Sequence, residues 1–386
     1  MRIGIDAREL SGRATGVGRY LAGLLREWTN GERARSHEFV LYAPEPVGIT
    51  LDAHRFATRI IPGTSGTWWE QMRLRSVAAA DHLDVFFAPA YTAPLRLDVP
   101  TVVTIHDLSY VAHPEWFRLR EGARRRWLTR ATAARARAIV TVSEFSKREI
   151  VERLGVSEAK VRVVRQGIDA PAGLAEARGD RERAEAGSAD LSAVARSAEA
   201  EGAKAGDADP RLLYVGSIFN RRRVPDLIRA VAALARRRSG ISLDLVGDNR
   251  TFPPQDIDRA IANHGMTGRV RWHRYATEEA LRDLYARARA FAFLSEYEGL
   301  GMTPLEALAV GIPPVVLDTP AARESLEDAA MYVPINGDVP AVALALETAL
   351  FDERARARVL GAAPAALAKY EWPHAARETL AVLERA

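Results

Sequence analysis

SEYEGLGMTPLE, residues 295–306, lies between two apolar runs, and this order predicts how the second half of the chain folds. The run 290–294 before it is short and apolar, which is typical of a buried strand. The run 305–310 after it has the length and composition of a helix, and Gly311 is a typical residue for the end of that helix. The stretch is therefore a loop that joins a buried strand to the start of a helix.

The residues at the start of this predicted helix are suited to capping it. We expect Thr303 as the N-cap, Pro304 at the first helical position and Glu306 in the place that completes a capping box. Free amides and the helix dipole favour an anion at such a start. Two interpretations stay open at this point: Glu298 and Glu306 serve a ligand, or Glu306 only caps the helix while Glu298 is solvated.

The spacing E-x7-E within the frame E-G-x-G-x-x-P-L-E-A, followed by A-x-G-x-P, resembles the signature of retaining, nucleotide-sugar-dependent glycosyltransferases of family 4, also called group 1. The resemblance implies an α/β chain of GT-B architecture, with two Rossmann-like parallel-sheet domains facing a central cleft. It also implies transfer of a hexose, without a metal, to a glycan or lipid-linked acceptor in cell-surface polysaccharide or glycolipid synthesis. Similarity to O-antigen-type mannosyltransferases favours GDP-mannose as the donor, and no cofactor is expected.

This resemblance assigns roles to residues of the stretch. Glu298 is expected to position the donor sugar and to stabilise positive charge at the reacting carbon, and Glu306 to hydrogen-bond the ribose hydroxyls. Glycines let the backbone approach a ligand closely. The other donor-binding residues expected in the stretch are Gly299, Leu300, Gly301, Met302 and Thr303.

A second charged loop is predicted after the strand 211–215, which Gly216 follows directly. The family usually has Arg-Lys in this loop, and Arg221 and Arg222 occupy those places here. Arginine keeps the positive charge of lysine but adds a planar fork. We expect Arg221 and Arg222 to stabilise the leaving diphosphate, because no His or Asp/Glu cluster has a spacing suited to a metal. The alternative is a solvated loop.

Two sites are expected in the first half of the chain. After the strand 2–6, Gly16 and Gly18 open a helix; Leu21 stands where a dinucleotide-binding motif needs its third glycine, so an NAD or FAD site is not expected. The resemblance makes this glycine pair a loop that faces the donor diphosphate, and a simple turn is the alternative. His106 follows the strand 101–105 in the frame of the family's donor-site histidine, although a lone histidine is more often structural.

The alternation of short Val/Ile-rich runs with helical patterns predicts parallel sheets. We expect an acceptor-side domain at 1–169, a low-complexity insertion or linker at 170–210 that is poor in large apolar residues, and a nucleotide-sugar-binding domain at 211–372. The helix 373–386 is expected to pack back on the first domain. The chain has 386 residues and no cysteine, which excludes disulfides and thiol chemistry.

The most basic stretch lies between Trp116 and Ala138 and interleaves arginines with aromatic residues. Three interpretations remain: a solvated helix face, a surface for an anionic membrane that carries a lipid-linked acceptor, and nucleic-acid binding, which no motif supports. No apolar run reaches the roughly 18–20 residues that span a bilayer, so we expect a cytoplasmic protein, at most peripheral on the membrane. The arginines are Arg118, Arg120, Arg124, Arg125, Arg126, Arg130, Arg135 and Arg137.

A function of a different class is kept beside the transferase. The arginine at the family's lysine position, Arg222, is a departure from the pattern, and it leaves open a non-catalytic nucleotide-sugar-binding protein of a surface-polysaccharide complex. Such a protein would bind the donor without turnover.

Overall fold

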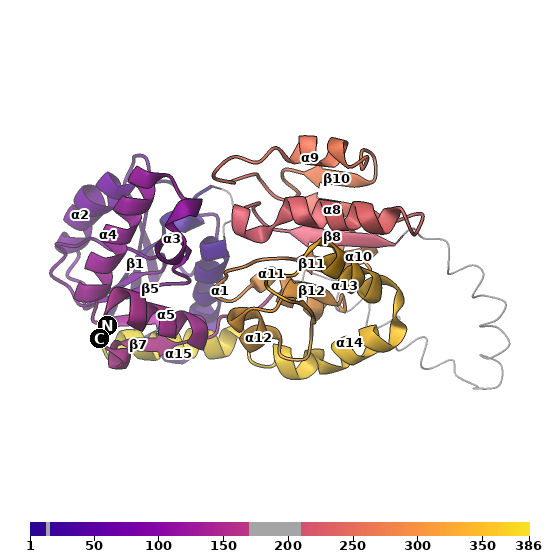
Figure 1. Cartoon of the computed structure of the whole chain (residues 1–386). Helices are drawn as coiled ribbons and strands as arrows, with labels where there is room; N and C mark the ends of the chain where they lie inside the picture. Colours follow the sequence, from indigo (N-terminus) through magenta and orange to yellow (C-terminus); the bar gives the residue numbers. More distant parts are fainter. Residues whose placement is uncertain (13–15, 170–209) are drawn as a thin grey trace, which may run out of the picture. The chain divides into compact units, whose positions relative to one another are not determined.

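The computed structural model describes residues 1–12, 16–169 and 210–386 and divides into two compact units (Figure 1). The first unit is Met1–Ile168 together with Ala368–Ala386, and the second is Asp169–Leu367. The insertion predicted at 170–210 lies, except for Pro210, outside the described residues.

The first unit is built on one sheet with helices on both faces. Its elements are β1 (Arg2–Asp6), η1 (Arg8–Leu10), α1 (Gly16–Asn30), η2 (Arg33–Ser36), β2 (Glu38–Ala43), β3 (Phe56–Ile60), η3 (Trp69–Leu74), α2 (Arg75–Ala80), β4 (Val85–Ala88), β5 (Thr101–Thr104), α3 (Ser109–Ala112), η4 (Pro114–Trp116), α4 (Leu119–Arg135), β6 (Ala138–Thr141), α5 (Glu144–Leu154), η5 (Glu158–Lys160), β7 (Val161–Val163) and, from the end of the chain, α15 (Trp372–Glu384).

The second unit repeats this architecture with a smaller sheet. Its elements are β8 (Arg211–Val215), η6 (Asn220–Arg222), α8 (Val224–Ala235), β9 (Ser242–Val246), α9 (Ile257–Asn263), β10 (Val270–His273), α10 (Glu278–Arg287), β11 (Ala290–Phe293), α11 (Met302–Ala309), β12 (Pro314–Leu317), α12 (Pro320–Leu326), β13 (Met331–Val333), α13 (Val339–Phe351) and α14 (Glu353–Leu367).

Both sheets are parallel and follow the Rossmann strand order. The first has the order β3-β2-β1-β4-β5-β6-β7 and the second β10-β9-β8-β11-β12-β13, with neighbouring strands paired in parallel register. The order reverses between β1 and β4 in the first sheet and between β8 and β11 in the second. Ligands of open α/β sheets bind beyond the carboxyl ends of the strands at such a reversal. The predicted α/β fold with two Rossmann-like units is confirmed.

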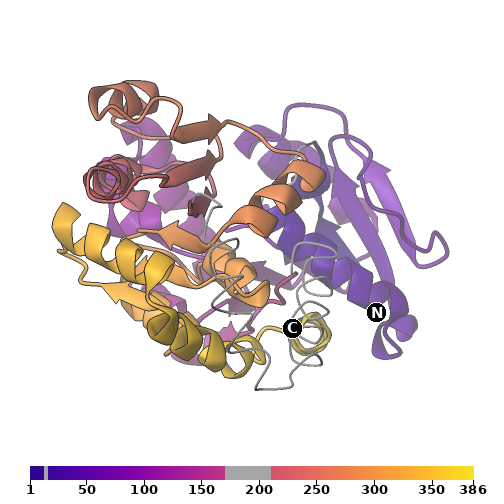
Figure 2. The ribbon, with the colours of Figure 1, turned by 90° about the vertical axis from the view of Figure 1, so that its right-hand side faces the viewer.

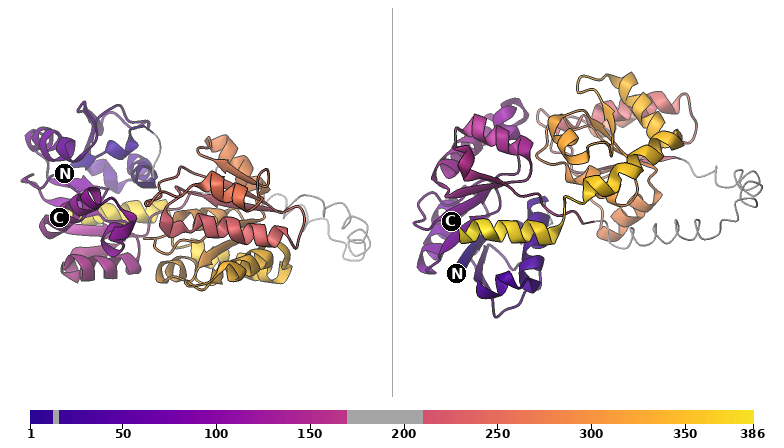
Figure 3. Two further views of the ribbon diagram at one scale, coloured as in Figure 1. Left: turned by 45° about the horizontal axis from the view of Figure 1, so that its top comes forward. Right: turned by 90° about the horizontal axis from the view of Figure 1, so that it is seen from below.

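The first sheet buries both faces, so residues of one strand alternate between two cores. In β2, Phe39 and Leu41 pack under α1 and α15, whereas Val40 and Tyr42 pack under the opposite helices. Figure 3 shows α15 lying against the first unit. The helix is held there by Trp372, whose indole ring occupies the space that a side chain at Gly23 or Gly167 would need.

The second sheet is covered in the same way. Figures 1 and 2 show that α8 and α13 lie on the same face of this sheet. The strands β11 and β12 are buried along their whole length, as expected of parallel strands covered on both faces. The carboxyl ends of β8 and β11 are therefore fixed by a packed core beneath them.

The strands predicted at 2–6, 211–215 and 290–294 are confirmed to within one residue. The predicted capping of the helix after 295–306 is wrong. Helix α11 begins at Met302, and its N-cap is Gly301, which has a φ of 78°. A left-handed backbone suits glycine, so the helix begins two residues earlier than it would with Thr303 as its N-cap. Pro304 is tolerated because the first amides of a helix have no intrahelical partner.

Candidate functional site

Two loops meet at the carboxyl edge of the second sheet, where its strand order reverses. The loop 216–223 follows β8, and the loop 294–301 follows β11. The backbone amide of Glu296 donates to the carbonyl of Arg221 at 2.8 Å, which ties the two loops together. The site is therefore built from segments that are far apart in the sequence but adjacent in the sheet.

The side chains of Arg222 and Glu298 form an ion pair between these loops. Nε of Arg222 lies 2.9 Å from Oε1 of Glu298, and Nε of Arg221 lies 3.7 Å from the same oxygen. The hydroxyl of Ser295 also donates to Oε1, at 2.8 Å. The carboxylate is thus held by two arginines and a serine that come from both loops.

Aromatic rings and a glycine fix the guanidinium of Arg222. The group lies 4.7 Å from the ring centroid of Phe293, and its Nη1 donates to the carbonyl of Ser217 at 2.9 Å. Gly216 has a φ of 142°, and a Cβ at this position would collide with Nη1 of Arg222. Gly216, which the sequence predicts as a donor-binding residue, therefore makes the room in which Arg222 lies.

The charges of this cluster stabilise one another. Burial alone would raise the pKa of Glu298, but the charges of Arg222 and Arg221 and the hydrogen bonds from Arg222 and Ser295 hold that pKa below its ordinary value. Burial alone would lower the pKa of Arg222, and the Glu298 carboxylate raises it above its ordinary value. Glu298 is therefore an ionised carboxylate at neutral pH, next to two cations.

The start of α11 follows directly on Glu298. Gly299, Leu300 and Gly301 connect Glu298 to the helix, whose first two residues are Met302 and Thr303. Thr303 Oγ1 is buried and has no hydrogen-bond partner among the described residues. Glu306 is 4% exposed, so it is not a solvated residue of the helix surface. The residues predicted in the stretch 295–306, together with Gly216, Arg221 and Arg222, thus belong to one edge of the second unit.

His106, Gly16 and Gly18 belong to the first unit. His106 lies beyond the carboxyl end of β5, and its Nε2 is 2.9 Å from the carbonyl oxygen of Pro89. A carbonyl only accepts, so Nε2 carries the proton and Nδ1 keeps a lone pair. Burial lowers the pKa of His106 more than the Pro89 carbonyl and Asp107 raise it. The ring is therefore neutral at pH 7 and offers an acceptor.

The glycine pair lies at the start of α1. Gly16 is the first residue of this helix and is exposed, whereas Gly18 is buried inside its first turn. The loop before it includes residues 13–15, which are outside the described residues. The interpretation of this pair as a diphosphate-facing loop stays a prediction.

Two further residues, one in each unit, were not predicted from the sequence. Ser295 lies inside the quoted stretch, but a single serine after a strand carries no pattern that would indicate a contact with Glu298. Tyr91 follows β4, has a φ of 60°, and donates from its hydroxyl to Asp107 at 3.2 Å beside His106. A bulky residue in the left-handed region stores backbone strain, and such strain gathers at functional sites.

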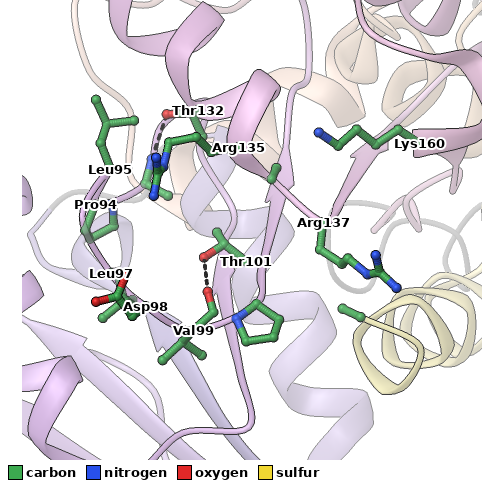
Figure 4. Close-up of a pocket in the computed structure, with 14 residues that line it drawn as sticks. Pro94, Leu95, Leu97, Asp98, Val99, Thr101, Thr132, Arg135, Arg137 and Lys160 are labelled. Carbon is green, nitrogen blue, oxygen red and sulfur yellow. Dashed lines mark hydrogen bonds between the residues drawn. The ribbon is translucent and has the colours of Figure 1, made fainter.

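Among the described residues, no metal cluster coincides with these loops, and a large pocket lies elsewhere. In the ranges 1–12, 16–169 and 210–386, no three His, Cys, Asp or Glu side chains are arranged to hold a metal ion. A pocket of about 630 Å³ lies in the first unit between the β4–β5 loop, the end of α4 and Lys160 (Figure 4). It includes Thr101 at the start of β5, and thus lies at the amino edge of the sheet, opposite to the edge where His106 lies.

Family models match both halves of the chain. The model "Glycosyltransferase Family 4" covers residues 14–170, and "Glycosyl transferases group 1" covers residues 196–364. A glycogen synthase of Mycobacterium tuberculosis is 29% identical over 303 residues, which cover 76% of this chain and 65% of that protein, so the chain spans just under two thirds of that relative. O-antigen chain mannosyltransferase B of Escherichia coli is 25% identical over 316 residues, which cover 80% of this chain and 76% of that protein.

Solved structures show the same fold at low sequence identity. The crystal structure of Anabaena Alr3699/HepE in complex with UDP and glucose aligns over 100% of both chains, with a TM-score of 0.72 and 17% identity. This likeness establishes the GT-B type of fold that the sequence predicts. With the two family models and the placement of E-x7-E on a strand–loop–helix at the sheet reversal, the chain belongs to the group 1 glycosyltransferases of family 4 type.

Proposed function

We propose that this protein transfers a hexose from a nucleotide sugar to a glycan or lipid-linked acceptor, with retention of the anomeric configuration and without a metal. The observation that carries the proposal is the cluster at the reversal of the second sheet. There an ionised Glu298 and two arginines lie beside the start of a helix whose N-cap is Gly301. Such a cluster provides positive charge for a diphosphate and negative charge for a sugar carbon that becomes electron-poor.

Each residue then has a role. Arg221 and Arg222, with the amides at the start of α11, stabilise the charge that develops on the leaving diphosphate. Glu298 positions the donor sugar, and the buried Glu306 hydrogen-bonds the ribose. His106 accepts a hydrogen bond from a sugar hydroxyl through Nδ1, because its Nε2 proton is committed to Pro89.

The donor we favour is GDP-mannose, and the synthesis we favour is that of a cell-surface polysaccharide or glycolipid. Support comes from the O-antigen chain mannosyltransferase among the relatives. UDP and glucose accompany the similar solved structure, and that likeness carries only the fold. The non-catalytic alternative depended on the arginine at position 222. Arg222 contacts Glu298 directly, so this departure does not favour that alternative.

We also propose that the basic helix α4 contacts an anionic membrane. Trp127 is 63% exposed on α4 between arginines one turn away on either side, and Trp68 in the neighbouring segment is also 63% exposed. Arg124 donates to Thr67 at 2.7 Å, which brings the two segments together. Exposed tryptophan beside arginine is typical of surfaces that bind the membrane interface. Among the described residues, no helix is long and apolar enough to span a bilayer.

The proposal is tested by calorimetric titration of the protein with GDP, UDP, ADP and dTDP in EDTA, followed by donor hydrolysis with the matching nucleotide sugars. We expect one nucleotide to bind without metal, and its mannose or glucose conjugate to be turned over by the wild type but not by Glu298→Gln. Full turnover by Glu298→Gln would remove the assigned role. Failure of all four nucleotides to bind, with and without Mg²⁺, would contradict the proposed function.

A further inference from the structure

The interactions of the Glu298 carboxylate are one-sided. Arg222 Nε, Arg221 Nε and the Ser295 hydroxyl all approach Oε1, at 2.9, 3.7 and 2.8 Å. In the part of the chain that the structure describes, the hydrogen bonds of Glu298 end on Oε1 and none ends on Oε2. One oxygen is therefore fixed by the protein while the other is left to a ligand.

Ser295 is the donor in this set that carries no charge. Its hydroxyl has one proton and two acceptors in reach, Glu298 Oε1 at 2.8 Å and the carbonyl of Tyr297 at 3.3 Å. The shorter contact to a charged oxygen is the stronger one. Ser295 is 6% exposed, so water does not compete for its proton. Arg222 is placed to serve the diphosphate in the proposed function, whereas the hydroxyl of Ser295 donates within its own loop, to Tyr297 and Glu298.

We propose that Ser295 is a positioning residue for Glu298, which holds Oε1 while a phosphate draws on Arg222 and thereby directs Oε2 at the donor sugar. This inference rests on the proposed function of Glu298. When the diphosphate shares the guanidinium of Arg222, the serine keeps the carboxylate in its rotamer. Its contribution therefore falls on turnover of the sugar and not on binding of the nucleotide.

The test compares Ser295→Ala with Ser295→Thr in the full chain. Ser295→Ala is expected to lower kcat roughly 10- to 100-fold, as follows from the loss of one hydrogen bond to a charged group. The affinity for the free nucleoside diphosphate is expected to stay within about twofold, which is a small fraction of one such bond. The reason is that Ser295 bonds Glu298, which the proposed function assigns to the sugar and not to the diphosphate. Ser295→Thr keeps the hydroxyl and is expected to restore most of the activity, because a cavity of about 20 Å³ beside Ser295 receives part of the added methyl group.

The pH profile separates positioning from a merely structural role. Loss of a donor to the carboxylate raises the pKa of Glu298, so the acid limb, where activity falls with falling pH, is expected to move to higher pH in Ser295→Ala. The matched control is Ser325→Ala. Ser325 lines the same cavity as Ser295, but its hydroxyl donates to the carbonyl of Ala322 and not to Glu298. Wild-type kcat and an unmoved limb in Ser295→Ala, with Glu298→Gln inactive, would overturn this inference alone. An active Glu298→Gln would instead overturn the proposed role of Glu298.

Discussion

Nε of Arg222 and Oε1 of Glu298 lie 2.9 Å apart, although the two residues are separated by 76 positions in the sequence. The pair joins the group assigned to the diphosphate with the group assigned to the sugar. Each keeps the other charged, since the pKa of Glu298 is lowered and that of Arg222 is raised. Changes at either residue should therefore affect both halves of donor recognition.

Replacing Arg222 by lysine and by alanine should give a graded loss. Lysine keeps the charge but has no fork with which to bond Glu298 and the Ser217 carbonyl at once. Alanine leaves the buried Glu298 with Arg221 as its cation and Ser295 as its hydrogen-bond donor. Truncating a partner of a buried charged hydrogen bond costs about 2–5 kcal/mol. We expect the order wild type, Lys, Ala for diphosphate affinity, measured by calorimetry. Equal affinity in all three would show that Arg222 does not contact the phosphate.

The sequence predicted the strands 2–6, 211–215 and 290–294 and the two loops that follow the last two, because parallel strands buried on both faces leave clear apolar runs. The family was recognised from the E-x7-E frame. It predicted Glu298, Arg221 and Arg222 as separate residues of one site. It did not predict that Arg222 and Glu298 touch, since pairing across the sheet reversal depends on the order β8-β11 and not on local pattern. Nor did it predict Gly301 as the N-cap of α11, because Thr303 and Pro304 are a more usual start.

Replacing Gly216 by alanine should weaken donor binding. The added Cβ would meet Nη1 of Arg222, and the φ of 142° is unfavourable for any other residue. We expect a loss of diphosphate affinity of about tenfold or more, equivalent to about 1.4 kcal/mol. The control is Gly268→Ala, where the φ is 82° but nothing lies within 4 Å of the added atom. If Gly268→Ala loses as much diphosphate affinity as Gly216→Ala, backbone strain and not the collision with Arg222 explains the loss.

The neutral state of His106 should be visible in the pH dependence. Its pKa lies below its ordinary value, so the ring stays neutral at pH 7 and is protonated only below that value. Protonation would turn the acceptor Nδ1 into a donor. We therefore expect the affinity for the donor to be constant between pH 7 and 8 and to fall at acid pH. The His106→Phe variant should not show that fall. A titration step near or above pH 7, assigned to His106 by NMR, would contradict this.

Binding to anionic vesicles should depend on both tryptophans and on arginines of the exposed face of α4. Reversal of Arg124, Arg125 and Arg126 is a poor test, because Arg126 donates to the carbonyl of Tyr110 and supports the fold. We expect Trp68→Ser with Trp127→Ser to reduce co-sedimentation with phosphatidylserine vesicles at low salt.

The control for this test is Leu344→Ser, which removes another 63% exposed apolar side chain, in the second unit. Donor affinity should be the same in both variants. If wild-type protein does not sediment with the vesicles at all, the exposed face of α4 is simply solvated.

The docking of α15 should be a main source of stability in the first unit. Trp372 is 8% exposed and its ring fills the space above Gly23 and Gly167. Trp372→Ala would leave a cavity, and such changes cost about 3–5 kcal/mol. Gly23→Ala would overpack the ring at a cost of about 1–3 kcal/mol. In denaturant unfolding, both variants should lose stability, whereas Gly361→Ala, in α14 with nothing within 4 Å of the added atom, should gain about 1 kcal/mol from helix propensity. If Gly23→Ala also gains stability, the ring of Trp372 does not pack on α1.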